Sequence, residues 1–403
     1  MVATLDGRRA VLTGGDDGSV RARDPLTGTQ VGASFRPEGA MGGRTLAAAV
    51  VNDRLVMISG AWDGRLAISD LAGPRPPSDG GAPNEPEVAD AWWKDRGYPS
   101  RTAITELSGR RVAVVGFSDG AVRVFDLHDG ADVSGPFAGH AETVMGVGVV
   151  SIGGRLLVAS GRDELVQHDL ASGEPVGSPL SLDVHALATA TVDGRPMLIV
   201  GQSSGILMRV DTATLAPLGE PMGGHTDRVW MIATTEVEGQ PVALSAGGET
   251  VNLWELRTGR ALCRELVRHP GGAYAVAVGE LNGRPVAFTA GRSGLVWRVD
   301  LVEAVRQRPS ARTVLDAGET VTALAVTTIG GRAWLVVGTS YRAKDGTGSA
   351  ILWCDPDDGS VRQKLPLIGV VEGLTGSGDT LVIAAEEGLL AYAAVPSAVE
   401  FHW

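Results

Sequence analysis

Cysteine is scarce in this sequence: the 403 residues include only Cys263 and Cys354. Two thiols exclude both a disulfide framework like that of small secreted domains and a zinc site built from cysteine alone. The sequence also lacks an apolar run of about 18 residues, an N-terminal secretion signal and an Asn-x-Ser/Thr glycosylation site. These absences predict a protein of the reducing cytoplasm, without membrane insertion.

Positive charge and aromatic side chains are scarce as well. Lys and Arg number 35 against 47 Asp and Glu, so the formal net charge is −12. An acidic chain creates no overall field that attracts nucleic-acid phosphates or anionic lipid, which excludes nucleic acid as an expected partner. Aromatic residues make up only 5% of the chain, whereas hydrophobic residues reach 44%, too much for a disordered polymer and enough for a folded core.

Glycine, in contrast, is abundant: the sequence holds 56, roughly twice the ordinary share of about 7%. Many glycines lie in two-residue turn signals between short apolar runs. Asn-Gly and Asp-Gly are the strongest short-range signals for a β-hairpin, because a type I′ turn needs positive φ at both central residues. Nine such first-hairpin turns recur: Asp6-Gly7, Asn52-Asp53, Ser108-Gly109, Gly153-Gly154, Asp193-Gly194, Glu238-Gly239, Asn282-Gly283, Gly330-Gly331 and Ser377-Gly378.

Each copy continues with a second hairpin and with a third strand that ends on an acidic residue. Second-hairpin turns such as Asp119-Gly120 and Ser293-Gly294 follow the apolar run, and a fourth strand follows the acidic residue. Four strands in about 43 residues are typical of a β-propeller blade. A degenerate ninth copy spans Leu381 to Val395. The acidic positions, 42 to 56 residues apart, are Asp24, Asp70, Asp126, Asp169, Asp211, Glu255, Asp300 and Asp355.

The repeat predicts an all-β fold, a closed β-propeller of four-stranded antiparallel blades with about nine repeat units. We expect a single propeller over residues 1–403, with insertions at 74–101 and 341–348. A ring of seven or eight blades with flanking extra strands is the alternative. Closure follows from burial, because a blade covers both faces of its sheet only when it has a neighbour on each side.

The copies resemble WD repeats, in which Gly-His opens a repeat and Trp-Asp closes it. Gly139-His140 and Gly224-His225 match the opening, while Trp254-Glu255 and Phe125-Asp126 approximate the closing. The resemblance covers essentially the whole chain, although the individual motifs are degenerate, as in WD repeats of the bacterial type. It implies a buried network of a histidine, a Ser or Thr, an Asp and a Trp in each blade. The matching blade-structural residues are His140, Ser160 and Asp163 in one copy, where His168 replaces Trp, and His225, Ser245 and Trp254 in another, where Glu249 replaces Asp.

No motif in the sequence predicts an enzyme. The segments 116–120 and 201–205 match the Gly-x-Ser-x-Gly nucleophile elbow, but both lie between two strands, and no helix follows them. The segments 126–132 and 355–359 are similar to calcium loops, and both lack the closing Glu that such loops need. The histidines show no ligand spacing such as His-Glu-x-x-His. We therefore expect no catalytic residue, no metal site and no cofactor.

The insertion at 74–101 carries the strongest interaction signal. Its second half contains Trp92, Trp93, Arg96 and Tyr98. Trp, Tyr and Arg are enriched at interface hot spots, which makes these residues candidates for binding a partner protein. The alternative is that the insertion folds back and buries both tryptophan rings on its own blade.

A second group of candidates follows from the WD resemblance. In that family, the loops that open the repeats and the second-hairpin turns lie on one face, around the mouth of the central channel, where WD propellers commonly hold peptides. Trp230 has another explanation, as a packing residue of an inner strand. The residues expected at the mouth are Trp62, Phe117, Arg162, Arg228, Trp230 and Arg292.

Arginine recurs directly after the first-hairpin turn. In a ring these arginines form a basic circlet on one face, which could bind an acidic partner through forked guanidinium contacts. The alternative is that duplicated turns carry Arg for solubility and protection of the sheet edge. The circlet consists of Arg8, Arg54, Arg110, Arg155, Arg195, Arg284 and Arg332.

The expected function is a non-enzymatic scaffold that binds one or more other proteins through these loops and the Trp-rich insertion. We expect a monomeric propeller or a subunit of a larger complex. This expectation rests on the repeat architecture and on analogy, since a fold alone does not determine function. The alternative is a propeller with a small-molecule-binding or hydrolytic site at its central channel, which would need polar groups from several blades in one pocket.

Overall fold

The computed structural model describes six strands before residue 71 and, after them, residues 97–127, 131–137, 139–329, 332–343, 346–368, 370–377, 380–385 and 388–393. Contacts divide the chain into two compact units, Met1–Asp95 and Arg96–Trp403. Each unit is described by itself.

The first unit contains two three-stranded antiparallel sheets. In both sheets the strands follow one another in chain order, and the second strand begins at the arginine that follows the first turn, Arg8 or Arg54. One sheet consists of β1 (Val2–Leu5), β2 (Arg8–Gly14) and β3 (Val20–Arg23), and the other of β4 (Gly43–Val51), β5 (Arg54–Ala61) and β6 (Leu66–Asp70).

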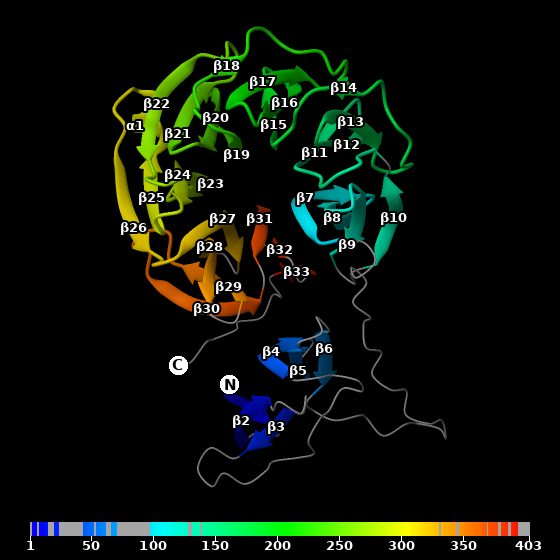
Figure 1. Ribbon diagram of the computed structural model, residues 1–403, viewed down its shortest axis with the longest axis vertical. Coiled ribbons are helices and arrows are strands. Elements are labelled where there is room, and N and C mark those ends of the chain that lie inside the picture. The colour runs from blue at the N-terminus through cyan, green and yellow to red at the C-terminus, as the bar shows by residue number, and fades with distance from the viewer. Residues whose placement is uncertain are drawn as a thin grey trace. The chain divides into compact units, whose positions relative to one another are not determined.

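The second unit contains six four-stranded antiparallel blades (Figure 1). Blade 1 holds β7 (Pro99–Leu107), β8 (Arg110–Phe117), β9 (Val122–Asp126) and β10 (Asp132–Phe137). Blade 2 holds β11 (Gly146–Ile152), β12 (Arg155–Gly161), β13 (Glu164–Asp169) and β14 (Leu180–Ser181). Blade 3 holds β15 (Ala186–Val192), β16 (Arg195–Gly201), β17 (Ile206–Asp211) and β18 (Met222–Gly223).

The other three blades have the same order. Blade 4 holds β19 (Val229–Val237), β20 (Gln240–Gly247), β21 (Thr250–Glu255) and β22 (Ala261–Arg268). Blade 5 holds β23 (Ala273–Leu281), β24 (Arg284–Gly291), β25 (Leu295–Asp300), the short helix α1 (Leu301–Val305) and β26 (Ala311–Asp316). Blade 6 holds β27 (Thr320–Ile329), β28 (Arg332–Ala343), β29 (Gly346–Cys354) and β30 (Val361–Ile368).

A last sheet closes the ring. It has three described strands, β31 (Val371–Ser377), β32 (Thr380–Ala385) and β33 (Gly388–Ala393). The first strands of successive blades contact one another around the ring, and β31 contacts β27 on one side and β7 on the other. Figure 1 shows these inner strands around the middle of the ring and the fourth strands at its outside.

The all-β propeller predicted from the repeat is confirmed, but the expected number of about nine blades is wrong, and so are the alternatives of seven and eight. The described strands form six four-stranded blades. The first two copies form three-stranded sheets in the other unit, and the last copy has three described strands. Turn signals count hairpins, whereas a blade also needs a fourth strand and neighbours that cover its faces.

The structure tests the two expected insertions only in part. Residues 74–96 lie outside the described residues, and 99–101 are the first residues of β7. The segment 341–348 lengthens the hairpin between β28 and β29, where Tyr341 pairs with Gly348 and Ala343 with Gly346. The expectation of a single domain over residues 1–403 stays a prediction.

Local sequence explains the hairpins. Asp193 and Gly194 have φ angles of 50° and 74°, and Asn282 and Gly283 have 52° and 74°, the left-handed pair that a type I′ turn needs. The apolar run after such a turn is covered on both faces, and Leu198, Ile199 and Val200 are fully buried. Burial on both faces follows because each blade lies between two others.

Close packing of neighbouring blades requires glycine at the end of the second strand. A Cβ at Gly161 would lie 2.5 Å from a methyl carbon of Val184, and a Cβ at Gly201 would lie 2.6 Å from a methyl carbon of Val229. Both valines lie at the start of the next blade. Part of the glycine excess therefore serves contacts between blades rather than turns.

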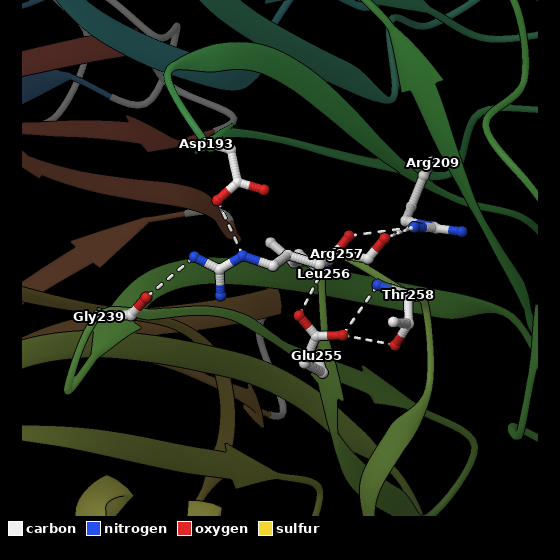
Figure 2. A network of polar contacts seen from close by, with 7 residues as sticks. All are labelled: Asp193, Arg209, Gly239, Glu255, Leu256, Arg257 and Thr258. Carbon is white, nitrogen blue, oxygen red and sulfur yellow. Dashed lines mark hydrogen bonds and ion pairs between the residues drawn. The ribbon is translucent and has the colours of Figure 1, made fainter.

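Two arginines at the same repeat position join a blade to the next one. Arg209 on β17 is 7% exposed, and its Nη1 donates to the carbonyl oxygens of Leu256 at 3.1 Å and Arg257 at 2.6 Å in blade 4. Arg257 in turn binds blade 3, because its Nε donates to Asp193 at 2.8 Å (Figure 2). In blade 5, Arg298 Nη1 donates to Asp357 Oδ1 of blade 6 at 2.9 Å.

Replacing Arg209 with methionine will lower the free energy of unfolding by about 2 kcal/mol, because two charge-assisted hydrogen bonds between blades are lost. Equilibrium unfolding in urea measures the change. Arg195→Met is the matched control, since Arg195 is an exposed arginine of the same blade. An equal loss in both variants would contradict the role assigned to Arg209.

Candidate functional site

Three rings form a continuous row at the beginning of the inner strands of blades 3, 4 and 5. His185 directly precedes β15, Trp230 lies in β19 and Tyr274 lies in β23. The His185 and Trp230 rings meet edge to face, with centroids 4.9 Å apart and planes at 86°. Trp230 and Tyr274 meet in the same way at 5.5 Å and 77°. Edge-to-face geometry is favourable for aromatic pairs, so the rings support one another.

A β-bulge positions two of the three rings. Val229 pairs with Gly247 and Met231 with Ala246, so that Trp230 is the extra residue between them. Tyr274 is the extra residue between Ala273 and Ala275 in the same way. A bulge turns the side chain of the extra residue away from the regular alternation. Val229 and Ala273 are fully buried, whereas Trp230 and Tyr274 are half-buried.

Two exposed arginines flank the rings. The Arg228 guanidinium lies over the Trp230 ring, 5.3 Å from its centroid. A Cβ at Gly271 would lie 3.1 Å from Arg292 Cδ, and the Tyr274 hydroxyl donates to the Gly271 carbonyl at 3.4 Å. Arg292 and Tyr274 therefore both lie against Gly271. We name His185, Arg228, Trp230, Tyr274 and Arg292 the aromatic–arginine patch.

The environment of His185 keeps its imidazole neutral. The ring is 3% exposed, and Nδ1 donates to the Val229 carbonyl at 3.1 Å. Burial lowers the pKa of His185, and the charges of Arg101 and Arg228 lower it further. The buried imidazole packs edge to face against Trp230 while its Nδ1 is bound to the Val229 carbonyl, so His185 supports the position of the Trp230 ring.

Arg101 brings a further positive charge to the interior of the ring. It lies in β7, and its Nη1 donates to the carbonyl oxygens of Ser100 at 2.9 Å and Glu372 at 3.3 Å. Burial lowers the pKa of Arg101, and the charge of Glu372 opposes that shift. The Thr102 and Thr375 hydroxyls, 2.7 Å apart, complete this contact between β7 and β31.

The structure brings together three of the residues expected at the mouth, Arg228, Trp230 and Arg292. Phe117 does not belong to them, because it is fully buried beneath Arg123, whose guanidinium lies 4.7 Å from the ring centroid. Arg162 of blade 2 pairs with Glu142 at 3.1 Å.

Most of the candidate residues in the Trp-rich insertion lie outside the residues that the structure describes. Tyr98 is 40% exposed, and its backbone N–H donates to Ser118 Oγ at 2.9 Å. Trp92, Trp93 and Arg96, as well as Trp62 among the mouth candidates, lie outside the described residues.

Sequence reasoning missed His185 and Tyr274. Both occupy the same place as Trp230, at the start of an inner strand, and the three rings are 44 or 45 residues apart. Aromatic residues at one repeat position in three successive copies were the available signal.

Four arginines of the circlet form ion pairs within their own blades, each with the acidic residue that ends the third strand. In blade 3, a hydrogen bond from the Thr214 hydroxyl lowers the pKa of Asp211 most, and the charge of Arg195 adds a smaller effect. Hydrogen bonds from the Ser172 backbone and from Arg155 lower the pKa of Asp169 to about 2. This pairing supports a structural role for the circlet. The ion pairs are Arg110–Asp126 at 3.7 Å, Arg155–Asp169 at 2.8 Å, Arg284–Asp300 at 2.9 Å and Arg332–Asp355 at 2.8 Å.

The side chains of Arg8 and Arg54 lie outside the description. Blade 4 has Gln240 in place of the arginine. There, Glu255 accepts hydrogen bonds from the backbone N–H groups of Arg257 and Thr258, both at 2.8 Å (Figure 2).

The residues assigned to the blade-structural network make hydrogen bonds inside blades 2 and 4. His140 Nε2 lies 2.9 Å from Ser160 Oγ. Burial and the charge of His168 lower the pKa of His140, and the charge of Asp163 opposes this shift. His225 Nε2 lies 2.6 Å from Ser245 Oγ, to which Trp254 Nε1 donates at 2.8 Å. A third pair in blade 5, His269 and Thr289 at 2.9 Å, has the same spacing of 20 residues and escaped the sequence analysis.

The serines of the two elbow-like segments are held in turns. Ser203 Oγ donates to Asp183 at 2.5 Å, and Ser118 Oγ accepts from the Tyr98 N–H. Asp355 and Asp357, from one of the calcium-like segments, pair with Arg332 and Arg298. The described residues contain no group of three or more His, Cys, Asp or Glu that could hold a metal ion.

Among the described residues, no helix is long and apolar enough to span a membrane. Neither a protein-family model nor a curated protein matches the chain.

Proposed function

We propose that this protein is a non-enzymatic scaffold of the WD-repeat type, in a bacterial cytoplasm, which binds a partner protein at the aromatic–arginine patch. The WD assignment is supported by the hydrogen-bonded chain of His225, Ser245 and Trp254. Further support comes from His140 with Ser160 and from the propeller of four-stranded blades.

The row of three rings with its two arginines is the observation that carries the proposal. A few residues supply most of the binding energy at protein interfaces, and Trp, Tyr and Arg are enriched among them. The rings hold one another edge to face, and a bulge fixes Trp230 and Tyr274 in place. A partner that covers them therefore loses little of its binding energy to ordering flexible side chains.

A hydrolytic alternative finds less support in the described part of the chain. In the common hydrolytic triad, a histidine activates the nucleophilic serine. Ser203 Oγ instead donates to Asp183 and Ser118 Oγ accepts from a backbone amide. The His185 ring contacts Trp230 and the Val229 carbonyl rather than either serine.

Replacing Trp230 with alanine will weaken binding of the partner about 30-fold, the effect of about 2 kcal/mol at an interface hot spot. The partner is first isolated with the purified protein as bait and identified by mass spectrometry. Its affinity for each variant is then measured by titration calorimetry.

Trp334→Ala is the matched control for Trp230→Ala. Trp334 is also half-buried, and the Arg332 guanidinium lies over its ring, 4.7 Å from the centroid. It lies in blade 6 near the first-hairpin turn, at the opposite ends of the strands from the patch. Equal affinity of the Trp230 and Trp334 variants would refute binding at the patch. If Trp92→Ala/Trp93→Ala weakens binding instead, the insertion is the interface.

A further inference from the structure

A hollow lies at the opposite ends of the inner strands from the aromatic–arginine patch. Its volume is about 450 Å³, and it is bounded by β11, β15 and β19 near their first-hairpin turns. Its polar lining consists of Ser151, Thr189, Thr191, Thr234, Thr235 and Glu236. Small-molecule sites commonly have volumes of roughly 300–1,000 Å³ with a few convergent polar groups.

One hydroxyl of this lining is used by the protein itself. Thr234 Oγ1 donates to the Thr189 carbonyl at 2.6 Å, which joins the walls of blades 3 and 4. Within the described residues, the Ser151, Thr191 and Thr235 hydroxyls and the Glu236 carboxylate have no protein partner. Ser151, Thr191 and Glu236 occupy the same repeat position in three adjacent blades, the residue before the last of each inner strand. Three strands therefore present available polar groups to one hollow.

The corresponding position between blades 5 and 6 is filled by packed residues. Gly279 in β23 occupies the position of Thr235, and a Cβ there would overlap Val326 of β27. The hollow thus depends on the particular residues of blades 2 to 4 and is not a general property of the repeat.

The lining selects the chemistry of a ligand. Hydroxyls both donate and accept hydrogen bonds, whereas the Glu236 carboxylate only accepts, and none of the described residues that line the hollow is a cation. A ligand must therefore offer several donors and carry no negative charge. Pro196 and Pro241 supply apolar surface for its carbon skeleton.

We propose that this hollow binds a small, uncharged polyhydroxylated molecule, such as a monosaccharide or a cyclic polyol, at a site separate from the protein-binding patch. Glu236 accepts from ligand hydroxyls, and Ser151, Thr191 and Thr235 complete the hydrogen bonds from the neighbouring strands.

The site is tested with four compounds: glucose, myo-inositol, trehalose and glycerol. Saturation-transfer NMR and calorimetry measure the binding of each compound to the full chain. At least one of these compounds will bind, and glucose 6-phosphate will bind at least about 10-fold more weakly than glucose because its charge meets Glu236. Glu236→Gln and Thr191→Val, which keep the side-chain shape, will each weaken binding about 10-fold.

Glu280→Gln is the matched control, since Glu280 has the same repeat position in blade 5 outside the hollow. Thermal unfolding confirms that each variant is folded. Failure of all four compounds to bind overturns the proposal, as does binding that Glu236→Gln and Glu280→Gln affect equally. Trp230→Ala leaves this binding unchanged, so the outcome is independent of the proposed scaffold function.

Discussion

Replacing Trp254 with alanine will lower the free energy of unfolding by about 3–5 kcal/mol, the usual cost of removing a large buried ring. Trp254 on β21 is 1% exposed and belongs to the apolar cluster that joins blades 3 and 4, with Ile199 and Ile232 among its members. The substitution leaves a cavity between two blades and removes the donor to Ser245. Equilibrium unfolding in urea measures the loss.

Trp254→Phe separates the two contributions to this effect. Phenylalanine keeps most of the buried volume and loses the hydrogen bond to Ser245, which is worth about 1 kcal/mol. We therefore expect a smaller loss than in the alanine variant. A loss below about 1 kcal/mol for Trp254→Ala would show that blades 3 and 4 do not depend on this ring.

The protein will become less stable as the pH falls from about 6.5 to about 4. Burial lowers the pKa of His225 to about 4 and the pKa of His269 to about 4, from 6.5 in an unfolded chain. Between these pH values the two histidines are protonated in the unfolded state, whereas they stay neutral in the folded state. Stability is therefore complete above pH 6.5 and falls as the pH approaches the folded pKa, by about 3 kcal/mol for each histidine.

Urea midpoints measured between pH 7.5 and 4 test this dependence, with His225→Gln/His269→Gln as the comparison. The double variant is less stable at neutral pH, and its stability changes less across the window because fewer buried imidazoles must charge. The low pKa of Asp169, about 2, places its own effect below the window. A double variant with the same steep acid loss as the native protein would assign that loss to other groups.

The hairpins of this fold were predictable because their causes are local. Asp193-Gly194 and Asn282-Gly283 need only their own backbone to adopt positive φ, and each apolar run is recognisable within a few residues. The resemblance to WD repeats implied a contact of His140 with Ser160 and of His225 with Ser245, and both pairs form hydrogen bonds at a spacing of 20 residues. The same spacing would have added His269 and Thr289.

The candidate site was only half predictable. Trp230, Arg228 and Arg292 were named from the sequence, whereas His185 and Tyr274 were indicated only by the repeat position that they share with Trp230. The contacts among the three rings join residues 44 or 45 apart in three separate blades. The bulges that turn Trp230 and Tyr274 out of the strand alternation depend on pairing with the next strand.

By itself, the sequence determined the β-strand repeat, its turns and its antiparallel hairpins, since these depend on residues close together in the chain. Only the tertiary structure decided that six copies form four-stranded blades, that Phe117 is buried and that Arg209 reaches the next blade. Each of these depends on which surfaces meet when sheets pack together. Packing between sheets is a non-local contact that turn signals do not encode.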